Sequence, residues 1–143
     1  MYQTLNLSHA EAQEMVDAVR HRLEAERKAA AIAVTDSHGE LVAFLKMDGC
    51  HLPPGQIAVN KAFTAARERR PSGAVGESSR TGPFPMTNFG DLRYTGFAGG
   101  VPVIVEGQVA GAIGISGLDE KAEAELGAMA VELVTRKARG GRS

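Results

Sequence analysis

The sequence predicts an α+β fold, organised as one domain over residues 1–143. Two apolar runs joined by the turn Glu106-Gly107, at 101–105 and 108–115, predict a β-hairpin. Other segments carry the periodicity of amphipathic helices. The composition, with 43% hydrophobic and 23% charged residues, is that of a globular domain large enough to bury a core. Strands and helices are therefore both expected around one core.

The first predicted helix begins after Ser8 and runs to about Lys28. Ser8 and Glu11 form a capping box, in which the serine bonds the amide of the third helical residue and the glutamate reaches back. His9 lies in the first turn, and His21 lies on the polar flank. Each histidine is either a plain surface residue or a metal or haem ligand. The apolar stripe consists of Ala12, Met15, Val16, Val19 and Leu23.

A second hairpin is predicted between the first helix and the next one. Its strands cover 31–35 and 40–47, and the polar residues 36–39 form the turn. The segment 48–55 then ends the second strand. It contains Cys50, the single cysteine of the chain, which excludes an internal disulfide and fits a reducing compartment.

The second predicted helix, about 56–70, carries a face of small side chains that allows close approach to a sheet. That face consists of Ile57, Ala58, Ala62, Ala65 and Ala66. Asn60 and Lys61 lie on the same helix, and Lys61 is its only lysine. Lys61 is either a solvated side chain or a cation aimed into a pocket, where burial eases loss of its proton or leaves it to hold an anion.

Residues 71–98 are predicted to form a long binding or interface loop. Structureless loops beyond about 12–15 residues are uncommon inside compact domains and tend to be lids or binding loops. Three of the five phenylalanines and one of the two tyrosines fall here, which is too aromatic for a disordered linker. Asn88, Phe89, Arg93 and Tyr94 are therefore assigned to a folded binding loop. A subunit interface is the alternative, because the same residue types are enriched there.

The hairpin at 101–115 is predicted to form the centre of the sheet. Gly111, Gly114 and Gly117 recur every third residue, so they cannot all lie on one face of a strand. Glycine inside a strand marks either a bulge or the close approach of another backbone or a ligand. Tight packing of helices on the hairpin is the plainer of these explanations.

The last predicted helix begins after a capping pattern that ends at Asp119, and its apolar stripe continues to Val134. The segment 136–143 is basic, ends in glycines and serine, and is predicted to be a frayed tail. No repeat or linker divides the chain.

Composition also limits the partners. The net charge of −1 leaves no basic stripe for nucleic acid. No apolar run approaches the ~20 residues that span a bilayer, so no membrane association is expected. The first residues lack the pattern of a signal peptide, and the protein is expected to be cytoplasmic.

Five short motifs, spread over most of the chain, carry a family resemblance. They are Ala33-Val34-Thr35-Asp36 with Gly39, Met47-Asp48-Gly49, Asn60-Lys61-Ala62 with Thr64-Ala65-Ala66, Gly99-Gly100-Val101-Pro102, and Gly111 to Gly117. In this order they resemble the GlcG/HbpS family, which includes the C-terminal domain of PduO-type proteins. The resemblance implies a profilin-like or PAS-like antiparallel sheet with helices packed on it. It also implies dimers or larger rings, haem or corrinoid binding, and operons of small-molecule catabolism.

The sequence departs from the common family pattern at two places. Lys46 stands where an arginine often precedes the Met-Asp pair, and the loop 87–94 is longer and more aromatic than expected. Such a loop suggests a specialised small ligand in place of haem.

The first functional hypothesis is a homo-oligomeric binding protein for haem or a related tetrapyrrole, with an accessory role in small-molecule catabolism. The resemblance implies this function. Lys61 would lie near the carboxylates of the ligand, and His9 or His21 would be its axial ligand. We favour this hypothesis.

The second hypothesis is a small enzyme that acts on an oxygenated organic or aromatic acid. Lys61, Arg93 and the backbone amides at Gly99-Gly100 would hold the anion, and Asp48 or Tyr94 would move a proton. The predicted ligand-binding set is Asn60, Lys61, Asn88, Phe89, Arg93, Gly99 and Gly100. An oligomeric accessory protein without chemistry is the third possibility.

Overall fold

One antiparallel sheet organises the protein. The structure, a computed structural model, describes residues 1–51 and 53–140. The sheet has the order β2-β1-β4-β3, with bounds β1 (Ala31–Asp36), β2 (Leu41–Lys46), β3 (Gly100–Val105) and β4 (Gln108–Ser116). Each neighbouring pair is antiparallel. The predicted α+β class is confirmed, as are both hairpins.

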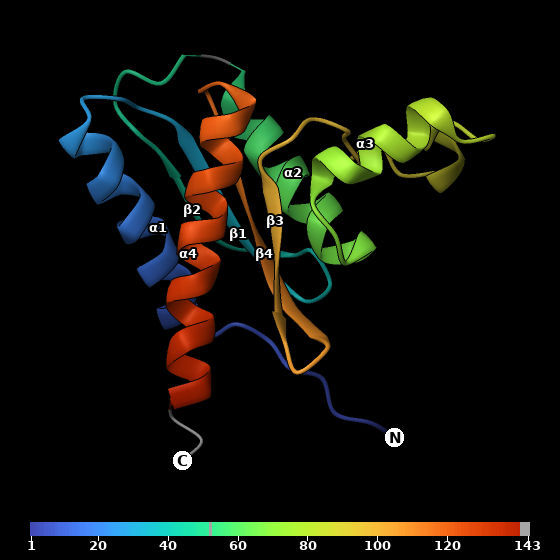
Figure 1. Ribbon diagram of the computed structural model, residues 1–143, viewed down its shortest axis with the longest axis horizontal. Helices are drawn as coiled ribbons and strands as arrows, with labels where there is room; N and C mark the ends of the chain where they lie inside the picture. The colour runs from blue at the N-terminus through green and yellow to red at the C-terminus, as the bar shows by residue number, and fades with distance from the viewer. Residues whose placement is uncertain (52, 141–143) are drawn as a thin grey trace.

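Helices cover both faces of this sheet (Figure 1). α1 (His9–Ala25) and α4 (Glu120–Gly140) lie side by side on one face, and α2 (Pro54–Glu68) lies on the other. Because side chains alternate along a strand, β1 sends Ile32 and Val34 toward α1 and α4 and its alanines toward α2. The α2 side is therefore built from small side chains, which bring the helix close to the sheet. No helix among the described residues is long and apolar enough to cross a membrane.

The first helix forms as its cap and stripe predict. The Glu11 amide donates to the Ser8 side-chain oxygen at 3.1 Å, which satisfies an amide that the helix itself leaves unpaired. The five predicted stripe residues are all buried: Ala12, Met15, Val16, Val19 and Leu23.

The hairpin of β3 and β4 supplies one central strand, β4, and one edge strand, β3. The register shifts between Val103 and Ile104, so a bulge lies beside Gly111, the partner of Val103. At Gly114 the cause is helix packing, because an added Cβ would lie 2.1 Å from the Ala58 carbonyl oxygen of α2. A Cβ added at Gly111 would also lie 2.2 Å from the Thr35 carbonyl oxygen of β1. Close approach of another backbone therefore explains both glycines, and the bulge is an additional feature beside Gly111.

The segment 71–98 differs from the structureless loop that its composition predicts. It contains α3 (Ser72–Thr81) and a short 3₁₀ helix, η1 (Met86–Phe89). α3 is rich in Gly and Ser and has little intrinsic helix propensity, so packing must hold it. α3 packs closely on the segment at Gly96: a Cβ added at Gly76 would lie 2.3 Å from the Gly96 carbonyl oxygen. We call residues 72–97 the arm, because α3 points away from the body of the protein (Figure 1).

α4 extends further than its stripe predicts. The helix continues through residues 136–140, where the sequence suggested fraying, and residues 141–143 lie outside the described part of the chain. Its start is capped by Asp119, whose side-chain oxygen accepts from the Ala122 amide at 2.9 Å.

Candidate functional site

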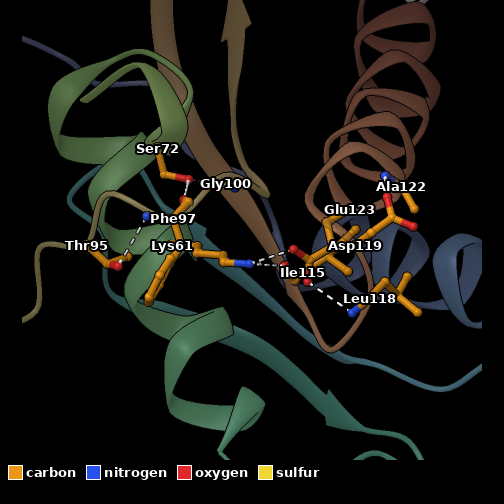
Figure 2. Close-up of polar contacts among 10 residues, drawn as sticks. All are labelled: Lys61, Ser72, Thr95, Phe97, Gly100, Ile115, Leu118, Asp119, Ala122 and Glu123. Atoms are coloured by element: carbon orange, nitrogen blue, oxygen red, sulfur yellow. Dashed lines mark hydrogen bonds and ion pairs between the residues drawn. The ribbon is translucent and has the colours of Figure 1, made fainter. Parts of the chain in front are cut away.

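Lys61 is buried under the sheet, so it is not a solvated lysine. Its side chain is 3% exposed, and α2 directs it toward the start of α4 (Figure 2). The Nζ atom lies 2.9 Å from Glu123 Oε1 and donates to the Ile115 carbonyl oxygen at 2.9 Å. The ammonium is thus held by one carboxylate and one backbone carbonyl, which satisfies a buried charge.

Glu123 is the partner that the sequence analysis missed. Its side chain is 3% exposed, and its second oxygen accepts from the Leu118 amide at 3.3 Å. Burial raises the pKa of this carboxyl, and the hydrogen bond from Lys61 opposes that change. A signal was present in the sequence, since Glu123 stands three residues before the buried Leu126, in register with the apolar stripe of α4.

The paired glycines of the predicted binding set lie against Lys61. Gly99 has a φ of 118°, and an added Cβ would lie 2.9 Å from Lys61 Nζ. The Gly100 amide donates to the Ser72 hydroxyl at 2.8 Å, and that hydroxyl donates to the Phe97 carbonyl oxygen at 2.6 Å (Figure 2). The Gly100 amide, one of the two proposed to hold an anion, is therefore already bonded within the protein.

Arg93, Tyr94 and Phe89 form a separate aromatic cluster. The rings of Phe89 and Tyr94 stack at 4.3 Å, and Tyr94 meets Phe63 edge to face at 5.2 Å. The Arg93 guanidinium lies 4.1 Å from the centre of the Phe63 ring. Lys61 and Phe63 are two residues apart on α2 and face different sides of it. Two of the predicted anion holders, Lys61 and Arg93, therefore lie on different sides of α2.

Arg93 also has an acidic partner within the arm. Its Nη2 atom lies 2.8 Å from Asp91 Oδ2. The hydrogen bonds from Arg93 lower the pKa of the Asp91 carboxyl from 3.8 to about 2. The guanidinium is therefore paired before any ligand arrives.

Of the other predicted site residues, Asn60 is bonded within its own helix and Asp48 lies far from Tyr94. Asn60 accepts from Gln56 on α2 at 2.9 Å. Asp48 is exposed just after the end of β2. Tyr94 lies near the beginning of this strand, because it packs on Phe63, and Phe63 contacts Gly39 just before β2 begins. Six strand residues separate these ends by roughly 20 Å. Asp48 and Tyr94 therefore do not share a site.

The two histidines lie on α1 and differ in their surroundings. Both are exposed, and at 1.5 Å per residue they stand about 18 Å apart along the helix. His21 Nε2 lies 3.2 Å from the Arg20 guanidinium. No cluster of three His, Cys, Asp or Glu side chains able to hold a bare metal ion occurs within residues 1–51 and 53–140. A haem iron, in contrast, needs only axial ligands from the protein.

His21 lines a groove of about 1100 Å³ between α1 and α4, and His9 does not. The apolar part of the lining consists of Ala18, Ala25, Ala128, Met129 and Leu133. The charged part consists of Arg22, Arg136, Lys137, Glu125 and Glu132. One imidazole, an apolar surface, three cations and two carboxylates therefore share this groove, and Lys61 is not part of its lining.

These features define a class: a single-domain α+β protein with helices on both faces of one antiparallel sheet and a groove between its two longest helices. Comparison with known proteins identifies the family. The model of the family described as haem degrading protein HbpS-like matches residues 7–132. The chain belongs to this family, and the resemblance carried by the five motifs is confirmed.

Individual relatives agree with this assignment. Protein GlcG of Escherichia coli K12 is 34% identical over 110 residues, which is 77% of this chain and 81% of that protein. The crystal structure of Klebsiella pneumoniae protein ORFY superposes with a TM-score of 0.84 at 26% identity, covering 92% of each chain. The crystal structure of a PduOC:heme complex gives a TM-score of 0.81 at 18% identity, covering 90% of this chain and 94% of that one. The last comparison bears on the fold alone.

Proposed function

We propose that the protein binds haem or a related tetrapyrrole in the groove between α1 and α4, with His21 as an axial ligand. The observation that carries this proposal is the convergence of His21, the apolar lining and the cations in one groove. Membership of the HbpS-like family and a fold shared with a protein crystallised with haem support it.

The side chains that line the groove suit a haem group. The macrocycle is flat and apolar, and side chains such as Ala128, Met129 and Leu133 offer it an apolar surface. Its carboxylates need cations at the edge of that surface. Arg136 and Lys137 line the groove. Arg136 pairs with Glu132 at 2.6 Å and Lys137 pairs with Glu14 at 2.8 Å, and both ion pairs are exposed. Exposed pairs of this kind contribute little and exchange readily.

His21 and Met129 are the two groove residues whose side chains belong to the types that bind haem iron. The His21 ring nitrogen that lies against Arg20 would have to release that contact to bind iron, because a ligating nitrogen uses its lone pair. When bound, haem supplies the chemistry of its iron, while the chain supplies the axial nitrogen and the cations. Lys61 has no part in this proposal.

A visible-absorbance titration with haem tests the proposal. We expect a saturable Soret shift at one haem per chain in the wild type and in His9→Ala, and its loss or a changed Soret maximum in His21→Ala. His9→Ala is the matched control, because His9 lies on the same helix but outside the groove. The absence of a saturable shift in the wild type would overturn haem binding. Equal spectra for His21→Ala and the wild type would remove His21 from the iron.

We also propose the accessory role in small-molecule catabolism that the family resemblance implies. The relationship to protein GlcG supports it. The genes beside the one that encodes this chain are the direct check, since a catabolic cluster is expected there. A neighbourhood of haem or cobalamin genes would favour a role in cofactor handling.

A further inference from the structure

The arm contains a cavity that the proposed haem groove does not use. Its volume is about 340 Å³, and it lies between α3 and the chain that returns through η1. Val75, Ser78 and Ser79 line it from α3, where spacings of three and four place them on one face. Phe84 and Phe89 line it from the returning chain. The cavity shares no lining residue with the groove between α1 and α4.

Contacts within the protein hold the walls of this cavity in place. The Met86 amide donates to the Ser79 side-chain oxygen at 2.8 Å, which ties the start of η1 to α3. The close crossing at Gly76 fixes α3 against the chain at Gly96. Phe89 is stacked on Tyr94 at 4.3 Å. The cavity is therefore formed before a ligand enters, which lowers the entropy cost of binding.

The lining combines aromatic surface with one cation. Arg70 is the charged residue among the lining side chains, and its Nη1 atom donates to the Ser78 side-chain oxygen at 2.8 Å. That bond uses one of the five N–H donors of a guanidinium. None of the described side chains that line the cavity is acidic. Glu77, on the same helix, is paired with Arg80. The cavity thus offers a positive group that no lining carboxylate neutralises.

We propose that this cavity binds a small planar aromatic carboxylate. A guanidinium matches a carboxylate through paired hydrogen bonds, and the Ser78 hydroxyl adds a polar contact beside Arg70. Phe84 and Phe89 provide faces on which a ring can stack or meet edge to face. Phe84 is 70% exposed, which is costly for a phenylalanine unless something covers it.

The size of the cavity limits the ligand to one or two rings. A cavity of about 150 Å³ takes benzene, and sites for drug-sized ligands begin at about 300 Å³. A volume of about 340 Å³ therefore suits a substituted or fused aromatic acid and excludes a macrocycle. The ligand class is distinct from the tetrapyrrole proposed for the groove.

Calorimetric titration of the full chain with benzoate and 2-naphthoate tests this inference. We expect saturable binding of both, tighter for 2-naphthoate because it covers more of the aromatic wall. Benzamide, which has the ring without the charge, and acetate, which has the charge without the ring, should each bind at least about tenfold more weakly than benzoate.

Substitutions identify the groups that bind. Arg70→Gln should weaken benzoate binding by about tenfold or more, because the hydrogen bonds to a charged group are lost. Phe84→Ala should weaken it by about two- to tenfold. Arg69→Gln is the matched control, since Arg69 is the neighbouring exposed arginine and does not line the cavity. Circular dichroism confirms that each variant is folded.

Several outcomes would overturn the inference. One is the lack of saturable heat with either acid at millimolar concentration. Another is equal binding of benzoate and benzamide, and a third is equal loss in Arg70→Gln and Arg69→Gln. The haem titration separates the two proposals, because Arg70→Gln should leave the Soret shift unchanged.

Discussion

At the scale of single residues, the buried pair of Lys61 and Glu123 joins α2 to the start of α4. Removing one partner leaves the other charge buried without a counter-charge. We therefore expect Lys61→Met to lower the free energy of unfolding by about 3–5 kcal/mol. Denaturant unfolding followed by circular dichroism measures this. Lys121→Met is the control, because Lys121 is an exposed lysine on α4, the helix that carries Glu123, and should change stability by less than about 0.5 kcal/mol.

The double variant Lys61→Met, Glu123→Leu distinguishes the cost of leaving one buried charge unpaired from the loss of the ion pair itself. Apolar pairs of similar volume often replace buried ion pairs without loss, so the double variant should be more stable than Lys61→Met alone. A double variant that is no more stable than Lys61→Met would contradict this account. The folded double variant also shows whether Lys61 affects ligand binding, since loss of binding by Lys61→Met alone can reflect unfolding.

Part of this residue-scale arrangement could be predicted from the sequence. The sequence predicts one site that contains Gly99-Gly100 and Lys61, the only lysine on a helix with a small-residue face. The structure places these residues together. Glu123 lies 62 positions further along the chain, and local periodicity carries no information on such a pairing. Arg93 was grouped with Lys61 by charge alone, whereas the geometry of α2 separates them.

At the scale of elements, the approach of α2 to the hairpin of β3 and β4 depends on glycine. An added Cβ at Gly114 would lie 2.1 Å from the Ala58 carbonyl oxygen and 2.7 Å from the Ala62 nitrogen. Both atoms are helix backbone, so α2 must move to make room. We expect Gly114→Ala to cost about 1–3 kcal/mol or more, measured by thermal or denaturant unfolding.

Gly55→Ala is the matched control for this prediction. Gly55 lies in the first turn of α2, and an added Cβ would meet only the Phe44 ring, at an ordinary 3.5 Å. The substitution should be neutral or stabilise the protein by up to about 1 kcal/mol, because alanine loses less backbone entropy than glycine. If Gly114→Ala proved as harmless as Gly55→Ala, tight helix packing would not be the reason for glycine at position 114.

The predictability of the elements follows the strength of their local patterns. α1 has a cap and an apolar stripe, and the hairpins have turn residues between apolar runs, so the sequence alone indicates them. α3 has neither, and two of its ten residues are glycine. It forms because Gly73 and Gly76 let the helix lie against the chain at 96–98. Such a tertiary contact stabilises a helix despite its low intrinsic helix propensity, and a local sequence pattern does not reveal it.

At the scale of the whole molecule, the arm exposes large apolar side chains. Leu92 is 97% exposed and Phe97 is 55% exposed, and α3 projects from the body of the protein (Figure 1). A contiguous apolar patch marks a site that another surface covers, and we expect Leu92 and Phe97 to belong to such a patch. The sequence predicts a homo-oligomer, a dimer or a larger ring. We expect its subunits to meet at the part of the arm that carries Leu92 and Phe97, neither of which lines the cavity.

Light scattering coupled to size-exclusion chromatography tests this last prediction. We expect a mass that is a multiple of the 15.0 kDa chain, because covering apolar surface of this kind favours association. Leu92→Asp should reduce that mass, since a carboxylate at the centre of an apolar contact is desolvated without a partner. Ile104→Asp, which adds the same charge at an exposed position of β3 outside the arm and the haem groove, should leave it unchanged. A wild-type mass of one chain at every concentration would contradict the oligomer, and equal behaviour of the two variants would move the contact away from the arm.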